Sequence, residues 1–212
     1  REPGFVPMER RHGFQWWAAN QCRHDYFDTW YFRDTPEPIR MDQYEPITLT
    51  DVAIEFLREH ADEPFCLVVG YSPPHDPYLA PPEYMAQYPP EDIKLRPNFV
   101  PGTVVGGRNP HEIGPEHLAG YYAAITCIDD QVGRLMRTLD ELGIAADTLF
   151  IFTSDHGDML GSNGYILKRK PHEESIKVPG IFRWPAAIRQ GKTKDALFAW
   201  VDLMPTLLSL GG

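Results

Sequence analysis

Apolar residues recur with a helical period in one long segment of the chain. Over residues 116–142 they follow one another at spacings of three and four, at Leu118, Tyr121, Ile125, Ile128, Val132, Leu135, Leu139 and Leu142. This pattern predicts a long helix with one buried stripe, and Gly143 is the residue expected to cap its end. A shorter amphipathic helix is predicted over residues 50–60, with one face formed by Val52, Ala53, Phe56 and Leu57.

Three short apolar runs predict strands, the first two of them buried. They are PFCLVVGYS at residues 64–72, TLFIFT at residues 148–153 and VPGIFRWP at residues 178–185. A further helix is expected over residues 201–210, and the segments 1–48 and 73–115 are expected to be long irregular loops. The order of these elements favours an α/β fold in which helices flank a mixed, mostly parallel central sheet.

Composition narrows the range of partners. The 212 residues carry a formal net charge of −10 with no run of like charges, which argues against nucleic acid and anionic membranes. No segment approaches the roughly 18 apolar residues that a membrane span requires. The three cysteines, Cys22, Cys66 and Cys127, lack the spacing of a zinc knuckle or a disulfide framework, so we interpret them as buried or free thiols.

Residues suited to chemistry follow two of the predicted strands, where ligands bind in open α/β sheets. Asp155 and His156 are adjacent, and a carboxylate and an imidazole can ligate one divalent cation if the chain turns at once, which Gly157 permits. The residues alone equally allow Asp155 to cap a turn and His156 to be a hydrogen-bonded loop histidine.

Two further residues could act on an anionic substrate. His75 lies among prolines in SPPHDPY and could bind an anionic ester or protonate its leaving group. Lys168 lies in GYILKRKPHEES and could hold an anionic group. The residues alone also allow His75 to be a loop histidine that hydrogen-bonds to the backbone, and Lys168 to be a solvated surface lysine. Asp129 and Asp130 point about 100° apart on a helix, so we do not expect them to share an ion.

Five segments, in chain order, resemble the sulfatase family of the alkaline phosphatase superfamily. They are RHGFQWW, GYSPPHDPYLAPPEY, YYAAITCIDDQVGRLMRTLDELGIAADTLFIFTSDHGDMLG, KRKPHEESIKVPGIFRWP and VDLMPTLLSL. The resemblance extends over nearly the whole chain. It implies that residues 1–212 are part of a single catalytic domain with the superfamily's mixed, mostly parallel sheet.

The resemblance also implies roles for particular residues. Asp155 and His156 would ligate a divalent cation, usually Ca²⁺. Lys168 would hold the sulfate group, and His75 would bind sulfate and assist the leaving group. The reaction would be hydrolysis of a sulfate ester on a small molecule or glycan, in an enzyme that is exported, periplasmic or lysosomal.

Several parts of the family pattern are missing from the sequence. None of the cysteines or serines has the C/S-x-P-x-R context that yields the formylglycine nucleophile, and the family's first Asp pair and its GKWHLG-like segment are absent. We expect these upstream of Arg1 and a smaller subdomain after Gly212. The chain is therefore interpreted as an internal fragment that is inactive by itself. Within it, Asn163, Leu167 and His172 replace the family's common His, Gly and Tyr.

Two other functions remain open at this level. One is a phosphate or phosphonate ester hydrolase of the same superfamily, which the identity of the upstream nucleophile would distinguish. The other is a homologue that binds sulfated glycans without cleaving them, which the absence of both the Asp pair and a nucleophile would favour.

Overall fold

The computed structural model describes residues 4–20, 24–105 and 111–211. Contacts divide the chain into two compact units. The first comprises residues 1–144 and 159–166, and the second comprises residues 145–158 and 167–212. Each unit is described separately below.

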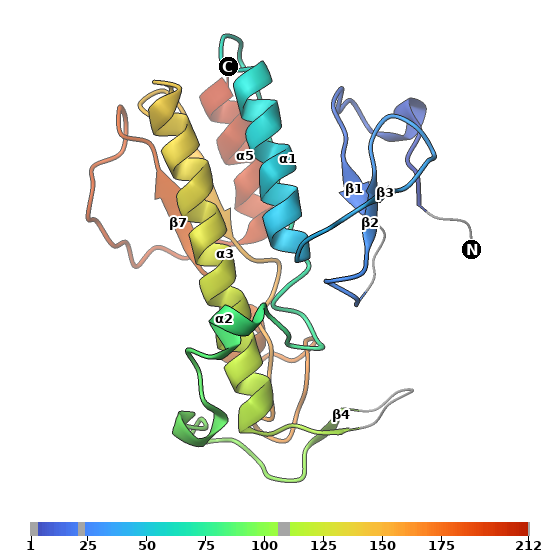
Figure 1. Ribbon diagram of the computed structural model, residues 1–212. Helices are drawn as coiled ribbons and strands as arrows, with labels where there is room; N and C mark the ends of the chain where they lie inside the picture. The colour runs from blue at the N-terminus through green and yellow to red at the C-terminus, as the bar shows by residue number, and fades with distance from the viewer. Residues whose placement is uncertain (1–3, 21–23, 106–110, 212) are drawn as a thin grey trace. The chain divides into compact units, whose positions relative to one another are not determined.

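Two long helices, running side by side in Figure 1, form the centre of the first unit. Helix α1 (Glu45–Glu59) begins five residues before the predicted segment, because Pro46 is accommodated in its first turn. Its predicted apolar face is confirmed, since all four residues named for it are buried. Helix α3 (Pro115–Glu141) closely matches the predicted range. Gly143 follows it with a φ of +73°, in the left-handed conformation of a helix-ending glycine.

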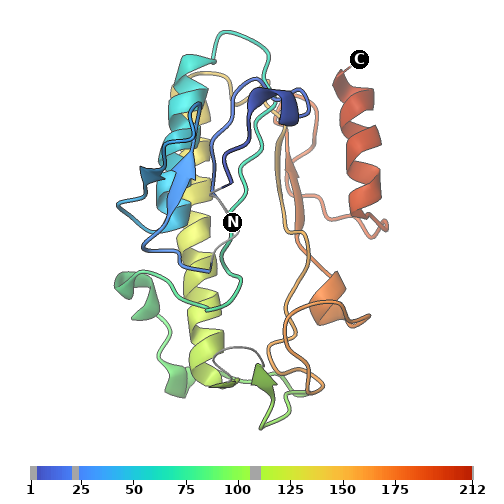
Figure 2. The same ribbon diagram turned by 90° about the vertical axis from the view of Figure 1, so that its right-hand side faces the viewer.

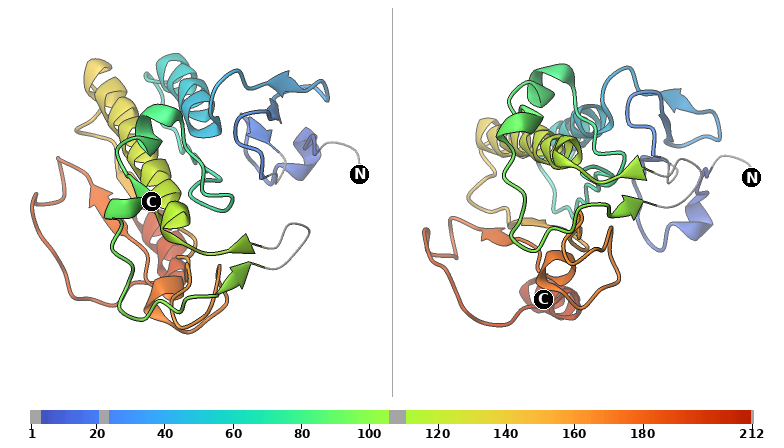
Figure 3. Two further views of the ribbon diagram at one scale, coloured as in Figure 1. Left: turned by 60° about the horizontal axis from the view of Figure 1, so that its bottom comes forward. Right: turned by 90° about the horizontal axis from the view of Figure 1, so that it is seen from below.

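The buried surface of α3 is wider than the predicted stripe. Ile125 is 42% exposed, whereas the small residues Ala123, Ala124 and Cys127 are completely buried. Helix α2 (Pro82–Met85) lies against α3 on this side, as Figure 3 shows. Residues 73–115, expected to be an irregular loop, therefore contribute a helix that covers the small residues of α3.

The rest of the first unit consists of short elements. Strands β1 (Ala19–Asn20), β2 (Trp30–Phe32) and β3 (Ile39–Arg40) form a three-stranded antiparallel sheet. Strands β4 (Val104–Val105) and β5 (His111–Glu112) form a two-stranded one. Two 3₁₀ helices, η1 (Met8–Arg10) and η2 (Pro90–Asp92), complete the unit.

The second unit contains strands β6 (Phe150–Thr153) and β7 (Gly180–Arg183), both within predicted strands. They pair antiparallel, with Ile151 opposite Phe182. Helix α4 (Glu173–Ile176) lies between them in sequence, and helix α5 (Trp200–Gly211) follows, as Figure 2 shows. The indole Nε1 of Trp200 donates to the Ser154 carbonyl at 2.9 Å, which ties the start of α5 to the end of β6.

The expected parallel sheet is not seen in the described part of the chain. Every strand ladder there is antiparallel, and residues 65–72 form no strand. Val68, expected to be buried in that strand, is 71% exposed. A strand exists only through hydrogen bonds to a neighbour, and no described segment pairs with this one. Among these residues, no helix is both long and apolar enough to cross a membrane.

Candidate active site

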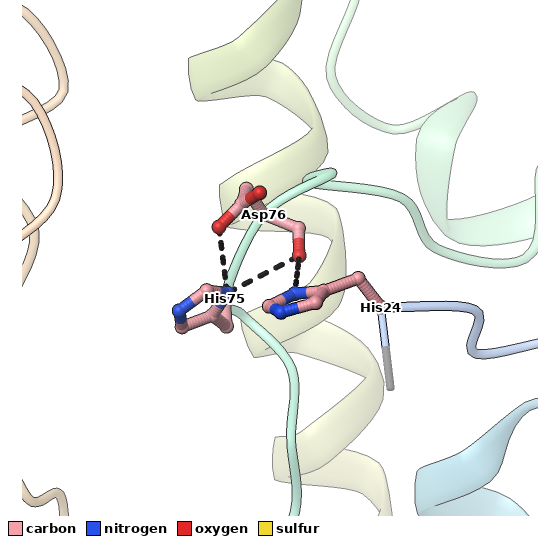
Figure 4. A group of neighbouring side chains, drawn as sticks. All are labelled: His24, His75 and Asp76. Carbon is pink, nitrogen blue, oxygen red and sulfur yellow. Dashed lines mark hydrogen bonds and ion pairs between the residues drawn. The ribbon is translucent and has the colours of Figure 1, made fainter. Parts of the chain in front are cut away.

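His75 is held by its own neighbour in the loop that follows residues 65–72. Its Nδ1 lies 2.7 Å from Asp76 Oδ1 and 3.2 Å from the Asp76 carbonyl oxygen, as Figure 4 shows. Both partners are hydrogen-bond acceptors, so Nδ1 carries the ring proton. This leaves Nε2 as the ring atom suited to exchange a proton with a bound group.

Tight packing against α3 fixes the position of the His75 loop. Tyr78 is 2% exposed and packs in a buried cluster with Leu118 of α3. A Cβ added at Gly120 of the same helix would lie 1.8 Å from the Tyr78 carbonyl oxygen. Only a glycine allows the loop to approach the helix so closely.

A second segment, distant in sequence, holds the same loop from the other side. Tyr26 is 3% exposed, and its hydroxyl donates to the carbonyl oxygens of His75 and Asp76 at 3.1 and 2.7 Å. His24 Nδ1 lies 3.1 Å from the Asp76 carbonyl oxygen, and its ring centroid is 4.7 Å from that of His75. Sequence reasoning missed both residues, because nothing local marks them within an aromatic-rich segment.

Glu45, which the sequence also did not indicate, anchors the start of the His75 loop. Its side chain is completely buried and accepts hydrogen bonds from Ser72 Oγ and Asn20 Nδ2, both at 2.7 Å. Burial raises the pKa of Glu45, although hydrogen bonds from Ser72 and Asn20 partly oppose the shift. The carboxylate thus fixes Ser72, three residues before His75.

The predicted metal pair lies at the end of β6 in the second unit. Asp155 Oδ2 and His156 Nε2 are 3.3 Å apart. His156 Nδ1 lies 2.8 Å from the Gly157 carbonyl oxygen, which makes Nδ1 the protonated atom and leaves the Nε2 lone pair beside the carboxylate. The Asp155 carboxylate also accepts the His156 backbone N–H at 2.9 Å.

Gly157 is required here for a different reason from the predicted one. It is absent from the glycines with positive φ, so the turn itself does not demand glycine. A Cβ at Gly157 would instead lie 2.1 Å from the Glu174 carbonyl oxygen. The Gly157 N–H donates to the Ser175 carbonyl at 2.9 Å. The close approach ties the Asp155–His156 turn to α4.

Lys168 is half-buried and lies between two residues of unusual backbone conformation. Leu167 has a φ of +56° and Arg169 a φ of +68°. These left-handed conformations explain why glycine would suit position 167. Lys168, Asp155 and His156 belong to the second unit, whereas His75 belongs to the first.

The remaining residues singled out in the sequence have structural environments. Asp130 accepts a hydrogen bond from the Tyr84 hydroxyl at 2.8 Å, which fits the structural interpretation of the acidic pair. Cys127 is a buried thiol, and burial raises its pKa to about 11. Cys66 is an exposed free thiol, and Cys22 lies outside the described residues.

Comparison with known proteins identifies the family. The profile of the Sulfatase family matches residues 4–212. This chain belongs to the sulfatase family. The ulvan-active sulfatase of Formosa agariphila is 36% identical over 99% of this sulfatase chain and 41% of its own length. The resemblance drawn from the five sequence segments is therefore confirmed.

Solved structures support the same assignment of fold. A crystal structure of yidJ from Bacteroides fragilis, a protein assigned to the sulfatases, has a TM-score of 0.87 and 33% identity over 99% of this sulfatase chain and 46% of its own. The phosphonate monoester hydrolase of Silicibacter pomeroyi has a TM-score of 0.69 and 28% identity over 78% and 37% of the two chains. The chain spans about two fifths of the length of the curated relatives that it matches.

Proposed function

We propose that this chain forms part of the single catalytic domain of a metal-dependent sulfatase, in which Asp155 and His156 hold a divalent cation. The supporting observation is the 3.3 Å separation of Asp155 Oδ2 and His156 Nε2. Two ligands at right angles on an ion about 2.4 Å away lie about 3.4 Å apart. The hydrogen bond from His156 Nδ1 to the Gly157 carbonyl matches the outer support usual for a metal-bound imidazole.

The cation that we propose is Ca²⁺. The Asp155 carboxylate suits calcium, and the family resemblance supports this choice over other divalent ions. When bound, the cation would neutralise negative charge on the sulfate oxygens. Two ligands make only half of such a site. The remaining ligands and the formylglycine nucleophile are expected from residues outside positions 1–212.

Two residues of the chain are proposed to act on the substrate directly. The Asp76 carboxylate stabilises a protonated His75 ring, whose Nε2–H could donate to the ester oxygen and assist the leaving group. Lys168 would bind the sulfate group as a point charge. These local charges are needed because a protein with a net charge of −10 repels an anionic ester over longer distances.

The substrate that we propose is a sulfate ester on a glycan or a small molecule. The name of the ulvan-active relative supports the glycan alternative. By family resemblance we further propose an exported, periplasmic or lysosomal location. The match to the phosphonate monoester hydrolase keeps phosphonate ester hydrolysis as the second candidate activity.

Hydrolysis assays on the natural protein that contains this chain test the proposal. We expect release of sulfate from an arylsulfate, and a loss of at least a hundredfold in Asp155→Asn. The control is Asp147→Asn, which changes an exposed carboxylate in the same unit and should retain activity. Phosphonate ester turnover in place of sulfate release would establish the alternative.

The separate chain of 212 residues provides a second test. We expect it to hydrolyse no arylsulfate, because it holds only half of the cation site. Turnover by this chain would show that the proposed division of the site is wrong. A natural protein that binds sulfated glycans but cleaves no ester would favour a non-catalytic homologue.

A further inference from the structure

The Asp76 carbonyl oxygen accepts more hydrogen bonds than a carbonyl ordinarily does. Tyr26 Oη lies 2.7 Å from it, His24 Nδ1 3.1 Å and His75 Nδ1 3.2 Å. A carbonyl oxygen has two lone pairs, so three donors exceed its usual capacity. The Asp76 carboxylate lies beside it, 2.7 Å from His75 Nδ1. Both imidazole Nδ1 atoms thus face oxygen atoms of one residue, the carbonyl oxygen facing both rings and the carboxylate facing His75 (Figure 4).

This arrangement suits a cation that bonds to nitrogen. One potential ligand atom from each of His24, His75 and Asp76 lies within 4.8 Å of the other two. From these contacts we propose that His24, His75 and Asp76 form a binding site for a transition-metal dication, with Zn²⁺ as the best match. All three residues belong to the first unit, whereas Asp155 and His156 belong to the second.

The ligand types select zinc over calcium. Two imidazoles and one carboxylate are a common three-ligand set for zinc and leave a fourth position for water. Ca²⁺ and Mg²⁺ prefer oxygen ligands, so two imidazoles disfavour them. Each Nδ1 now carries a proton that faces an Asp76 oxygen. Moving that proton to Nε2 converts Nδ1 into a ligand without changing the charge of a neutral ring.

The site needs only small movements to bind an ion. Zinc ligands at about 2.0–2.2 Å from the ion lie about 3.3–3.6 Å apart in a tetrahedral site. Atoms up to 4.8 Å apart must therefore approach by at most about 1.5 Å, whereas His75 Nδ1 and Asp76 Oδ1, now 2.7 Å apart, must separate by less than about 1 Å. The side chains of His75 and Asp76 are 25% and 28% exposed, which leaves them room to rotate and solvent access for the ion. The backbone is fixed, because the buried Tyr26 hydroxyl bonds to both residues of the loop.

Zinc binding has a consequence that depends on the proposed function. If His75 acts on the sulfate ester, a zinc ion on its ring removes that group from the reaction. Zinc would then inhibit sulfate hydrolysis by occupying the imidazole that acts on the ester. The binding of zinc itself does not depend on that role.

Titration calorimetry of the metal-free natural protein that contains this chain with Zn²⁺, in excess Ca²⁺, tests the proposal. We expect one zinc site whose affinity falls at least tenfold in His24→Gln, His75→Gln and Asp76→Asn. The matched control is His60→Gln, which removes an imidazole whose Nδ1 lies 2.5 Å from the Glu63 carboxylate. A His24→Gln variant that binds zinc like the unaltered chain would overturn the site.

Nitrogen NMR of the unaltered natural protein keeps the test independent of how the variants fold. On adding Zn²⁺, the protonated nitrogen should move from Nδ1 to Nε2 in His24 and His75 but not in His60. Unchanged spectra of both rings would refute the site. Zinc binding without sulfate hydrolysis by the natural protein would instead refute only the proposed function.

Discussion

The hydroxyl of Tyr26 bridges two consecutive carbonyl oxygens, those of His75 and Asp76, at 3.1 and 2.7 Å. About fifty residues separate Tyr26 from this loop in the sequence. The bridge fixes the backbone on either side of the histidine proposed to act on the sulfate ester. It therefore ties the half-buried His75 loop to the rest of the first unit.

Tyr26→Phe removes the bridge and retains the ring. Because two partly buried hydrogen bonds are lost, we expect the free energy of unfolding to fall by about 1–3 kcal/mol in urea denaturation. The control is Tyr122→Phe on α3, which should change it by less than about 0.5 kcal/mol. Equal effects of the two substitutions would show that the Tyr26 hydroxyl does not hold the loop.

The close approach of the Tyr78 carbonyl oxygen to α3 predicts that a methyl group at Gly120 destabilises the chain. Gly120→Ala places a methyl group 1.8 Å from the Tyr78 carbonyl oxygen, so either the loop or the helix must move. We expect a loss of about 2 kcal/mol or more in the free energy of unfolding. Gly133→Ala in the same helix meets only the flexible end of Arg137 at 3.3 Å. It should stabilise the chain by up to about 1 kcal/mol. Destabilisation by both would contradict the packing argument.

The sequence predicted the helices well because their hydrogen bonds are local. Helices α1 and α3 were both found from periodicity, since every helical turn is closed by residues four apart. The strand expected at residues 64–72 did not form, although its composition resembles that of β6. Strand formation depends on a partner, and local composition does not specify one.

The same distinction applies to the candidate site. Asp155 and His156 were predicted because they are adjacent and follow a recognisable strand. His24, Tyr26 and Glu45 reach the His75 loop from segments 27 to 52 residues away. No short pattern encodes such contacts. Gly157 was singled out for the turn that it permits, whereas the structure requires glycine there for close packing against Glu174. Sequence alone cannot distinguish these two reasons for a glycine.

The backbone conformation of Leu167, next to Lys168, predicts that a glycine variant there is more stable than an alanine variant, which reverses the usual order. Leu167 has a φ of +56°, where any Cβ is unfavourable by about 1–2 kcal/mol. Leu167→Gly should therefore be more stable than Leu167→Ala by about 1 kcal/mol in thermal or urea unfolding. At Lys177, where φ is −90°, the alanine variant should be the more stable of the two. If the alanine variant is the more stable one at position 167 as well, Leu167 is not held in the left-handed conformation.

Buried Glu45 predicts a specific dependence of stability on pH. Its pKa is raised in the folded state, so the unfolded chain ionises first as the pH rises above about 4.3. The unfolded state then binds fewer protons, and stability contributed by Glu45 falls with rising pH until the folded pKa is passed.

Urea denaturation between pH 4 and pH 8 measures this effect. In Glu45→Gln, the free energy of unfolding should lack the decrease with rising pH that Glu45 causes, which is at most about 1.4 kcal/mol per pH unit. Glu141→Gln, an exposed change at the end of α3, should keep it. If Glu45→Gln follows the unaltered chain at every pH, the buried carboxylate does not contribute to the pH dependence.

Gly157 connects the proposed cation ligands to α4, and its replacement separates the two. In Gly157→Ala the new methyl group meets the Glu174 carbonyl oxygen at 2.1 Å, which breaks the hydrogen bond from Gly157 N–H to the Ser175 carbonyl. We expect at least a tenfold loss of Ca²⁺ affinity in the natural protein, measured by calorimetry, because the Asp155–His156 turn shifts. Gly180→Ala in β7 meets nothing within 4 Å and should leave calcium affinity unchanged. If Gly157→Ala binds calcium normally, the geometry of this turn does not control the cation site, and the carboxylate and imidazole must reach the ion by another arrangement.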